Sequence, residues 1–160
     1  MSRTAGAAGH QKLPEAEAGP MTEDVERVVP YPDRDSKPWW EAVARHELVH
    51  QRCEDCSTWR WPPRAMCSAC GSFAWSWQPV GGLGTVISAI RTHHAFLPGF
   101  EAPYHTVFVS IAEQADIVMP GSWHASTAPV VGMRVRVHFD DLGVRDGEPV
   151  SLVGWRPVDD

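Results

Sequence analysis

Four cysteines form two closely spaced pairs near the middle of the chain. Ten residues separate Cys53-x-x-Cys56 from Cys67-x-x-Cys70, and these pairs account for all four cysteines of the sequence. A two-residue gap lets both thiols of a tight turn point at one centre, so two such turns supply the four corners of a tetrahedron. Four thiolates fill the coordination shell of zinc, which predicts a structural Zn²⁺ with no open position for substrate.

Two other uses of the same cysteines are a pair of disulfides and redox chemistry at one Cys-x-x-Cys motif. Disulfides need an oxidising compartment, and the segment from Met1 to Pro30 lacks the apolar core of a signal peptide. Zinc and a cytoplasmic location are therefore favoured. No run of about 18 apolar residues occurs, so we expect no membrane partner.

The charge balance argues against nucleic acid as a partner. The chain has 14 basic and 20 acidic residues, and residues 71–160 carry 5 basic and 9 acidic ones. Binding to a phosphate backbone needs a basic excess, which no segment provides. A single-stranded nucleic-acid-binding protein stays an alternative function, because the zinc ribbon and the OB-fold barrel predicted below are both folds that bind such strands.

The N-terminal half divides into three predicted segments. Residues 1–32 are rich in Ala, Gly, Glu and Pro without apolar periodicity, which predicts a disordered leader. Residues 33–47 predict a helix capped by Asp35 or Ser36, with Trp39 and Trp40 in its first turn as core anchors or as a pair that docks a partner. Residues 48–79 predict the zinc ribbon.

From residue 80 the pattern becomes all-β. Apolar residues alternate in five segments, which predicts five strands at 85–92, 104–112, 115–119, 134–139 and 150–155. We expect an irregular connection from Pro120 to Pro129 and an acidic loop from Asp140 to Glu148. The fold class is thus mainly β: an N-terminal helix, a zinc ribbon, which the family resemblance described next implies to be rubredoxin-like, and a five-stranded OB-fold barrel at 80–157.

Several short motifs in this order resemble one known family, the acyl-CoA-associated proteins first described as domain of unknown function thirty-five. The matching stretches cover roughly Pro32 to Arg156 and are Trp39-Trp40-Glu41-Ala42, Gln51-Arg52-Cys53, Pro62-Pro63-Arg64, Cys70-Gly71-Ser72, Gly84-Thr85-Val86 with Ser88, Pro98-Gly99-Phe100, Pro103-Tyr104 and Val131-Gly132-Met133-Arg134-Val135. The sequence departs from the family at Ile117–Ala128, where Pro120 and Gly121 interrupt the third strand of the barrel.

The resemblance implies a non-catalytic subunit. Similar proteins pair with thiolase-like enzymes, for example in steroid side-chain or other lipid metabolism, or with hydratase-like partners. In such pairs the small protein supports the CoA-substrate site, and the partner supplies the nucleophile and the base.

The surface that contacts CoA or the partner is predicted around the Pro62-Pro63 arm. Guanidinium groups suit a CoA phosphate, and flat aromatic rings suit adenine or a partner surface. Alternatively, Arg60 and Arg64, the arginines on either side of this arm, pair with Glu54 and Asp55 on the ribbon surface. The predicted contact residues are Arg60, Trp61, Arg64, Trp39, Trp40, Phe100 and Tyr104.

Loop histidines raise a second alternative, a stand-alone histidine-dependent enzyme. His93, His94, His105 and His124, with Glu101 or Asp116, are the candidates for a general base or a second metal site. No catalytic motif supports this alternative, and the cysteines are already assigned to zinc. We therefore predict no catalytic residue in the chain.

Overall fold

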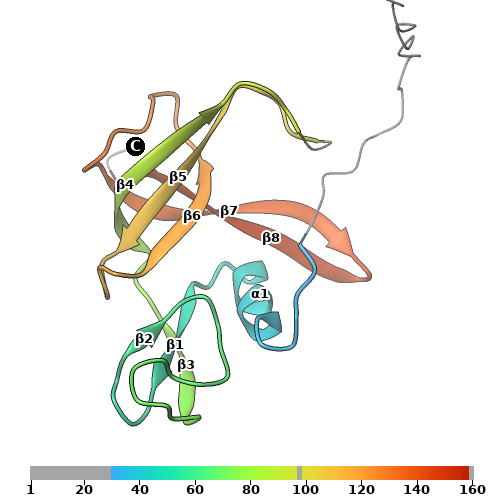
Figure 1. The fold of residues 1–160 in the computed structure, drawn as a ribbon. Coiled ribbons are helices and arrows are strands. Elements are labelled where there is room, and N and C mark those ends of the chain that lie inside the picture. Colours follow the sequence, from blue (N-terminus) through green and yellow to red (C-terminus); the bar gives the residue numbers. More distant parts are fainter. Residues whose placement is uncertain (1–29, 97–98, 159–160) are drawn as a thin grey trace, which may run out of the picture.

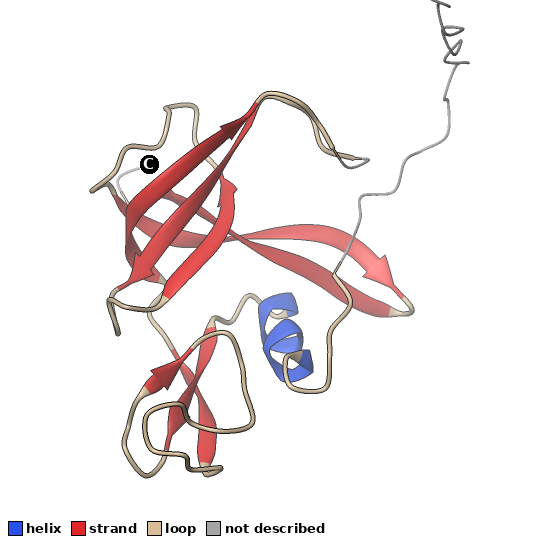
Figure 2. Cartoon of the chain, in the orientation of Figure 1, coloured by secondary structure: helices blue, strands red, loops and turns tan. Residues whose placement is uncertain are grey.

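The computed structural model describes residues 30–96 and 99–158 (Figure 1). The leader predicted at residues 1–32 therefore lies almost entirely outside the described residues. The described chain forms one short helix, a three-stranded sheet and a closed five-stranded barrel. The mainly β fold class is confirmed, and strands dominate the view in Figure 2.

Helix α1 spans Lys37–Ala44, and Ser36 is its N-cap. Pro38 lies in the first turn, where the missing N–H has no intrahelical partner to lose. The helix ends earlier than the predicted residue 47, because the N–H of Glu47 bonds to the carbonyl oxygen of Ala42 at 2.9 Å and His46 adopts a left-handed φ of 61°. This reversal directs the chain into the first strand of the ribbon.

The ribbon sheet consists of β1 (Val49–Cys53), β2 (Trp59–Arg60) and β3 (Trp75–Pro79) in the order β2-β1-β3. Both pairings are antiparallel, and Cys53 lies opposite Trp75 at the end of β1. Three residues separate the end of β3 at Pro79 from the start of the barrel at Leu83. The division into 33–47, 48–79 and 80–157 remains our proposal for the domains.

The barrel contains β4 (Leu83–Thr92), β5 (Tyr104–Ile111), β6 (Val118–Trp123), β7 (Arg134–Arg145) and β8 (Glu148–Pro157). Its closed order is β4-β5-β6-β8-β7. Alternate residues such as Val107, Val109 and Trp155 are buried, as expected for a small barrel whose interior is filled by side chains. The β6–β8 pairing is parallel and covers just Ser122↔Gly154 and Trp123↔Trp155.

Two expectations for the barrel were wrong. The third strand continues through Pro120 and Gly121, although both residues usually interrupt a strand. Pro120 is exposed, and Gly121 fits the close approach of β8, because a Cβ there would lie 2.6 Å from Cδ1 of Trp155. The segment Asp140–Glu148 is also mostly strand, since Asp146 and Gly147 with positive φ form a tight hairpin turn between β7 and β8.

The helix and the ribbon pack against the barrel through one continuous apolar core. Trp39, Val43 and Leu48 belong to the same buried cluster as the barrel residues Val109 and Met119. Figure 1 shows α1 between the ribbon and the long β7–β8 hairpin. In the part of the chain that the structure describes, no helix is long and apolar enough to cross a membrane.

His50 lies at the junction of ribbon and barrel. Its ring is fully buried, it stacks on Trp61 at 5.6 Å between ring centroids, and its Nε2 lies 3.2 Å from Sδ of Met119. Burial lowers the pKa of His50 from 6.5 to about 4, because the charged ring would lose its hydration. The native fold therefore requires a neutral His50.

Acidification is expected to weaken the fold through His50. Because the folded-state pKa is below the unfolded value, this stability is complete above pH 6.5 and falls as the pH drops from 6.5 towards 4. The full loss is about 3 kcal/mol at 1.36 kcal/mol per pKa unit. Urea unfolding of the wild type and of His50→Gln at pH 7 and pH 5 tests this, since acid effects on the cysteine cluster are common to both proteins. Equal pH dependence in the two proteins would contradict the assignment.

Candidate metal centre and adjoining groove

The four predicted metal ligands converge at one end of the ribbon. All four sulfur atoms lie within 4.8 Å of one another, with Cys53 Sγ 3.6 Å from Cys70 Sγ and Cys56 Sγ 3.7 Å from Cys67 Sγ. Zinc–sulfur bonds of about 2.3 Å in a tetrahedron separate the sulfurs by about 3.8 Å. The donor set and its spacing thus fit a single tetrahedral metal ion.

Two tight turns position these thiols. The N–H of Ser57 bonds to the carbonyl oxygen of Cys53 at 3.0 Å, and the N–H of Gly71 bonds to that of Cys67 at 2.8 Å. Gly71 has a φ of 76°, which favours glycine directly after the second pair. Hydrogen bonding between Cys56 and Thr58 lowers the pKa of Cys56 to about 6, and this favours the thiolate form that binds metal.

A groove of about 650 Å³ lies where the helix, the ribbon and the barrel meet. Strands β6 and β8 form one wall through residues such as Pro120 and Leu152. Trp39 contacts Trp40 and Trp61 with ring centroids 4.6 and 4.5 Å apart, and Phe100 contacts Tyr104 at 5.7 Å. The groove is lined by five of the predicted contact residues: Trp39, Trp40, Trp61, Phe100 and Tyr104.

Arg60, which we expected on the surface, is buried with 6 % exposure. Its three guanidinium nitrogens have no hydrogen-bond partner among the described residues, and the group lies 5.8 Å from the ring centroid of Trp75. A cation–π contact of this kind replaces part of the lost hydration. Arg60 is thus a packed residue of β2 in this structure, and the expectation of an accessible cation there was wrong.

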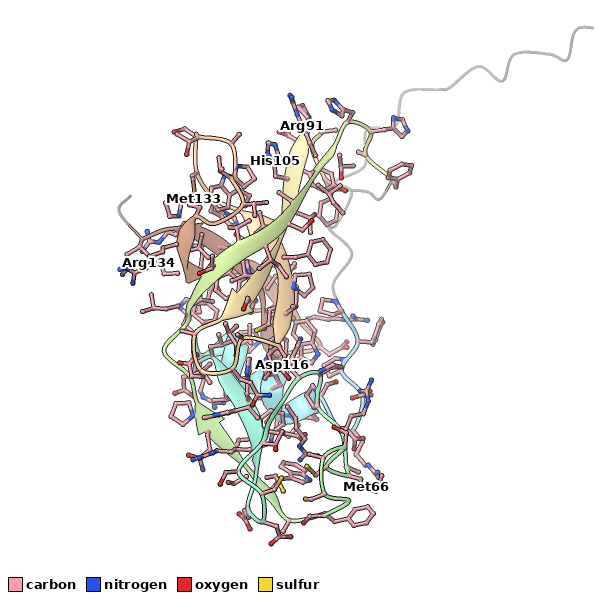
Figure 3. All side chains as sticks on the ribbon, turned by 60° about the vertical axis from the view of Figure 1, so that its left-hand side comes forward. Met66, Arg91, His105, Asp116, Met133 and Arg134 are labelled. Atoms are coloured by element: carbon pink, nitrogen blue, oxygen red, sulfur yellow. The ribbon has the colours of Figure 1, made fainter. Side chains whose placement is uncertain are left out.

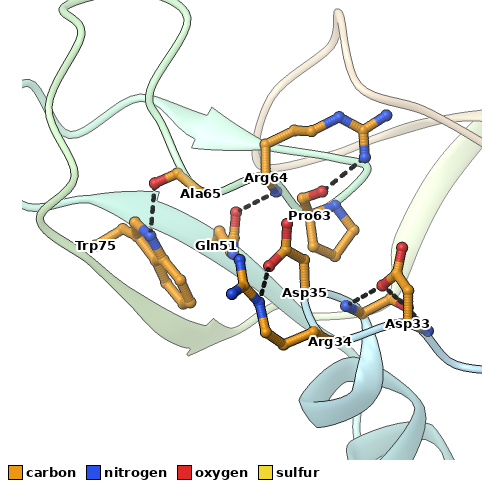
Figure 4. A network of polar contacts seen from close by, with 9 residues as sticks. Asp33, Arg34, Asp35, Gln51, Pro63, Arg64, Ala65 and Trp75 are labelled. Carbon is orange, nitrogen blue, oxygen red and sulfur yellow. Dashed lines mark hydrogen bonds and ion pairs between the residues drawn. The ribbon is translucent and has the colours of Figure 1, made fainter.

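Arg64 is exposed and lies outside the groove. The backbone N–H of Arg64 donates to Oε1 of Gln51 at 2.9 Å, and Nη1 of its side chain donates to the carbonyl oxygen of Pro63 at 2.8 Å (Figure 4). No ion pair with Glu54 or Asp55 is found for either arginine within the described ranges. Arg64 therefore presents a cation beside the Pro62-Pro63 arm.

Among the described residues, no group of potential metal ligands contains His93, His94 or His105. His105 pairs with Arg91 at the end of the barrel remote from the ribbon, whereas Asp116 lies at the end next to it (Figure 3). His124 instead lies beside His138 and Asp140, two residues that the sequence patterns did not select. The fourth predicted strand ended at residue 139, whereas β7 continues through Asp140, and alternation along this longer strand places residues 138 and 140 on one face.

The fold and the cysteine cluster define a class of protein in which a zinc ribbon precedes an OB-fold barrel. Residues 40–76 match the family description "ChsH2, rubredoxin-like zinc ribbon domain", and residues 77–140 match "ChsH2, C-terminal OB-fold domain". The chain belongs to the ChsH2 family, also called DUF35.

Solved structures and a curated protein are among the proteins similar to the chain. A chain of the structure described as "Ltp2-ChsH2(DUF35) aldolase" is 34 % identical with a TM-score of 0.68, and the match covers 80 % of this chain and 98 % of that one. A DUF35 protein of unknown function from Sulfolobus solfataricus is 10 % identical with a TM-score of 0.51, covers 65 % of this chain and 77 % of that one, and shows the fold alone.

The curated protein is "Probable enoyl-CoA hydratase alpha subunit" from Thermomonospora curvata. It is 42 % identical over 92 residues, which is 58 % of this chain. The matched part is 29 % of the length of that subunit, so the chain spans less than a third of this relative.

Proposed function

We propose that this chain is a non-catalytic subunit that binds a thiolase-like or hydratase-like enzyme and supports the CoA-substrate site of that partner. The observation that carries the proposal is the match to nearly all of the ChsH2(DUF35) chain at 34 % identity. The curated relative from Thermomonospora curvata has the words enoyl-CoA hydratase in its name, which supports a substrate of the acyl-CoA class. We propose lipid or steroid side-chain metabolism as the setting, and the cytoplasm as the location.

The groove supports this role because of its chemistry. Its lining includes Trp40, Phe100 and Tyr104, and these aromatic residues are partly exposed. Interface cores are enriched in aromatic side chains and depleted in charged ones. We therefore propose that the groove receives apolar side chains of the partner, next to the acyl chain of the substrate.

Arg64 is the proposed CoA-phosphate contact on this chain. Its guanidinium is exposed and keeps donors available beyond the one bonded to Pro63. Arg60 is proposed to act indirectly by holding Trp75 and the β2 strand in place. In this assignment the ribbon metal is a structural zinc, and the catalytic nucleophile and base belong to the partner.

Co-expression with thiolase-like and hydratase-like enzymes of the same genome, followed by size-exclusion chromatography, tests the proposal. A stable complex with one of these enzymes is expected, together with acyl-CoA turnover that exceeds that of the partner alone. Phe100→Ala and Tyr104→Ala are expected to weaken assembly at least about tenfold, because aromatic residues in the centre of an interface contribute about 2 kcal/mol or more.

Phe73→Ala is the matched control, since this phenylalanine is 72 % exposed on the ribbon and does not line the groove. It should assemble like the wild type. Equal assembly of all three variants would place the partner surface elsewhere, and failure of every candidate enzyme to bind would contradict the proposed function.

Arg64→Ala is expected to raise the apparent KM for the CoA substrate several-fold while assembly and zinc content stay unchanged. The reason is the loss of one solvent-exposed charge pair with phosphate, and such pairs contribute about 0.2–1 kcal/mol. Steady-state kinetics of the assembled complex measure this, and Arg64→Lys is the control that keeps the charge. Kinetics equal to the wild type in Arg64→Ala would show that Arg64 does not bind CoA.

A further inference from the structure

Three neighbouring strands bring polar side chains together on the outside of the barrel. Strand β8 runs between β6 and β7, and Gly154 of β8 lies opposite Ser122 of β6 on one side and His138 of β7 on the other. Side chains alternate along a strand, so Asp140 shares the face of His138. His124 lies just beyond the end of β6, where its N–H bonds to the carbonyl oxygen of Trp155 at 2.9 Å.

The glycine at position 154 leaves room for these groups to meet. A Cβ there would lie 2.6 Å from Cδ2 and Nε2 of His124 and 2.7 Å from Oγ of Ser122. Real Cβ atoms do not approach so closely, so any side chain at residue 154 would displace the histidine and the hydroxyl. The space above Gly154 is therefore filled by side chains of the flanking strands.

The contacts within this cluster are short and involve specific atoms. Oδ2 of Asp140 lies 2.9 Å from Nε2 of His124 and accepts a hydrogen bond of 2.9 Å from the Ser122 hydroxyl. Nε2 of His124 also lies 2.8 Å from the Ser122 oxygen. A catalytic triad would need the serine and the aspartate on different ring nitrogens, so this geometry does not activate Ser122 as a nucleophile.

The arrangement does match a cation site. His138 Nε2 lies 3.6 Å from Oδ1 of Asp140, beyond hydrogen-bond distance, and the nitrogens of both histidines and the carboxylate fall within 4.8 Å of one another. Ligand bonds of about 2.1 Å separate neighbouring donors by about 3.0–3.4 Å in octahedral or tetrahedral sites. Two neutral imidazoles and one carboxylate carry a single negative charge, which suits a divalent ion.

We propose that His124, His138 and Asp140 form a second metal site that binds a divalent transition ion such as Zn²⁺. Imidazole and carboxylate donors suit zinc, iron and nickel, and three protein ligands leave positions for water. The side chains are 28, 37 and 16 % exposed, so solvent reaches the site. The Ser122 hydroxyl orients the carboxylate, as second-shell donors do in metal sites.

The bound ion would tie β6 to β7 across β8. The β6–β8 ladder covers two residue pairs, while β7 and β8 pair along nearly their whole length. An ion held by His124 on one side and by His138 and Asp140 on the other would therefore reinforce the shortest seam of the barrel. Its binding is expected to raise the unfolding temperature of the protein.

Zinc titration of the purified full-length protein tests this site separately from the ribbon. When the cysteine cluster already holds zinc, calorimetry is expected to show that the wild type binds a second equivalent of Zn²⁺, which a chelator removes. The imidazole nitrogen signals of His124 and His138 should shift in NMR spectra, and the unfolding temperature should rise. His138→Ala and Asp140→Asn should each lose the second equivalent and retain the first.

His105→Ala and Asp116→Asn are the matched controls, because these residues lie outside the cluster and should bind zinc like the wild type. Ser122→Ala keeps all three ligands and should weaken the second zinc about 10–100-fold. The proposal is overturned if the wild type binds a single equivalent. It is equally overturned if folded Asp140→Asn and Ser122→Ala proteins bind the second zinc with wild-type affinity.

Discussion

Loss of one ribbon thiolate is expected to prevent the protein from folding. The purified wild type should carry one tightly held zinc at the cysteine cluster, and Cys53→Ser or Cys67→Ser should yield aggregated or misfolded protein. Cys53 and Cys67 are both buried, so their replacement leaves a defect inside the ribbon as well as an incomplete ligand set. Structural zinc contributes about 10–16 kcal/mol to such small modules, which equals or exceeds the whole stability of a typical domain, about 5–15 kcal/mol.

Metal analysis and circular dichroism measure this effect. Met66→Ala is the control, because Met66 is exposed on the same loop as Cys67 and is not among the cluster's ligands. It should retain zinc and fold normally. Fewer than about half an equivalent of metal in the wild type, together with unchanged stability after chelation, would refute a structural zinc.

The elements that the sequence predicted correctly are those with a local physical signal. The Cys-x-x-Cys spacing reflects the geometry of a single turn, and the alternation of Val107, Val109 and Ile111 reflects one buried face of a strand. The strand β6 was cut short because Pro120 and Gly121 oppose strands locally. The reason for Gly121 lies in Trp155, which is 34 residues away along the chain and became visible only in the folded barrel.

The groove and the cluster above Gly154 depend on contacts between distant segments. Aromatic side chains at residues 39, 61 and 100 were individually selected, but nothing in their spacing predicts a shared groove. Arg60 was expected at the surface because arginines usually are exposed, and its position opposite Gln51 on a buried strand face was not visible from the residue type. His138 lay on a predicted strand, but Asp140 was assigned to a loop that proved to continue β7, and His124 follows a strand whose end was misplaced.

Trp39→Ala is expected to destabilise the protein by about 3–5 kcal/mol, the usual cost of deleting a buried tryptophan. Trp39 is 4 % exposed and joins α1 to the ribbon through Trp61 and to the shared core. Trp40→Ala should cost less, because Trp40 is partly exposed beside the groove. Urea unfolding of the zinc-loaded proteins measures both changes, and a larger loss in Trp40→Ala would reverse the assigned roles.

Trp39→Phe separates packing from docking. The indole N–H of Trp39 is buried without a hydrogen-bond partner among the described residues. An unpaired buried donor costs about 1–3 kcal/mol, so replacing the indole by a phenyl ring removes this penalty and offsets part of the lost contact area. Trp39→Phe should therefore be far more stable than Trp39→Ala and should assemble with the partner enzyme like the wild type. Weakened assembly of a stable Trp39→Phe protein would instead mean that the indole N–H donates to the partner, which would make Trp39 a docking residue.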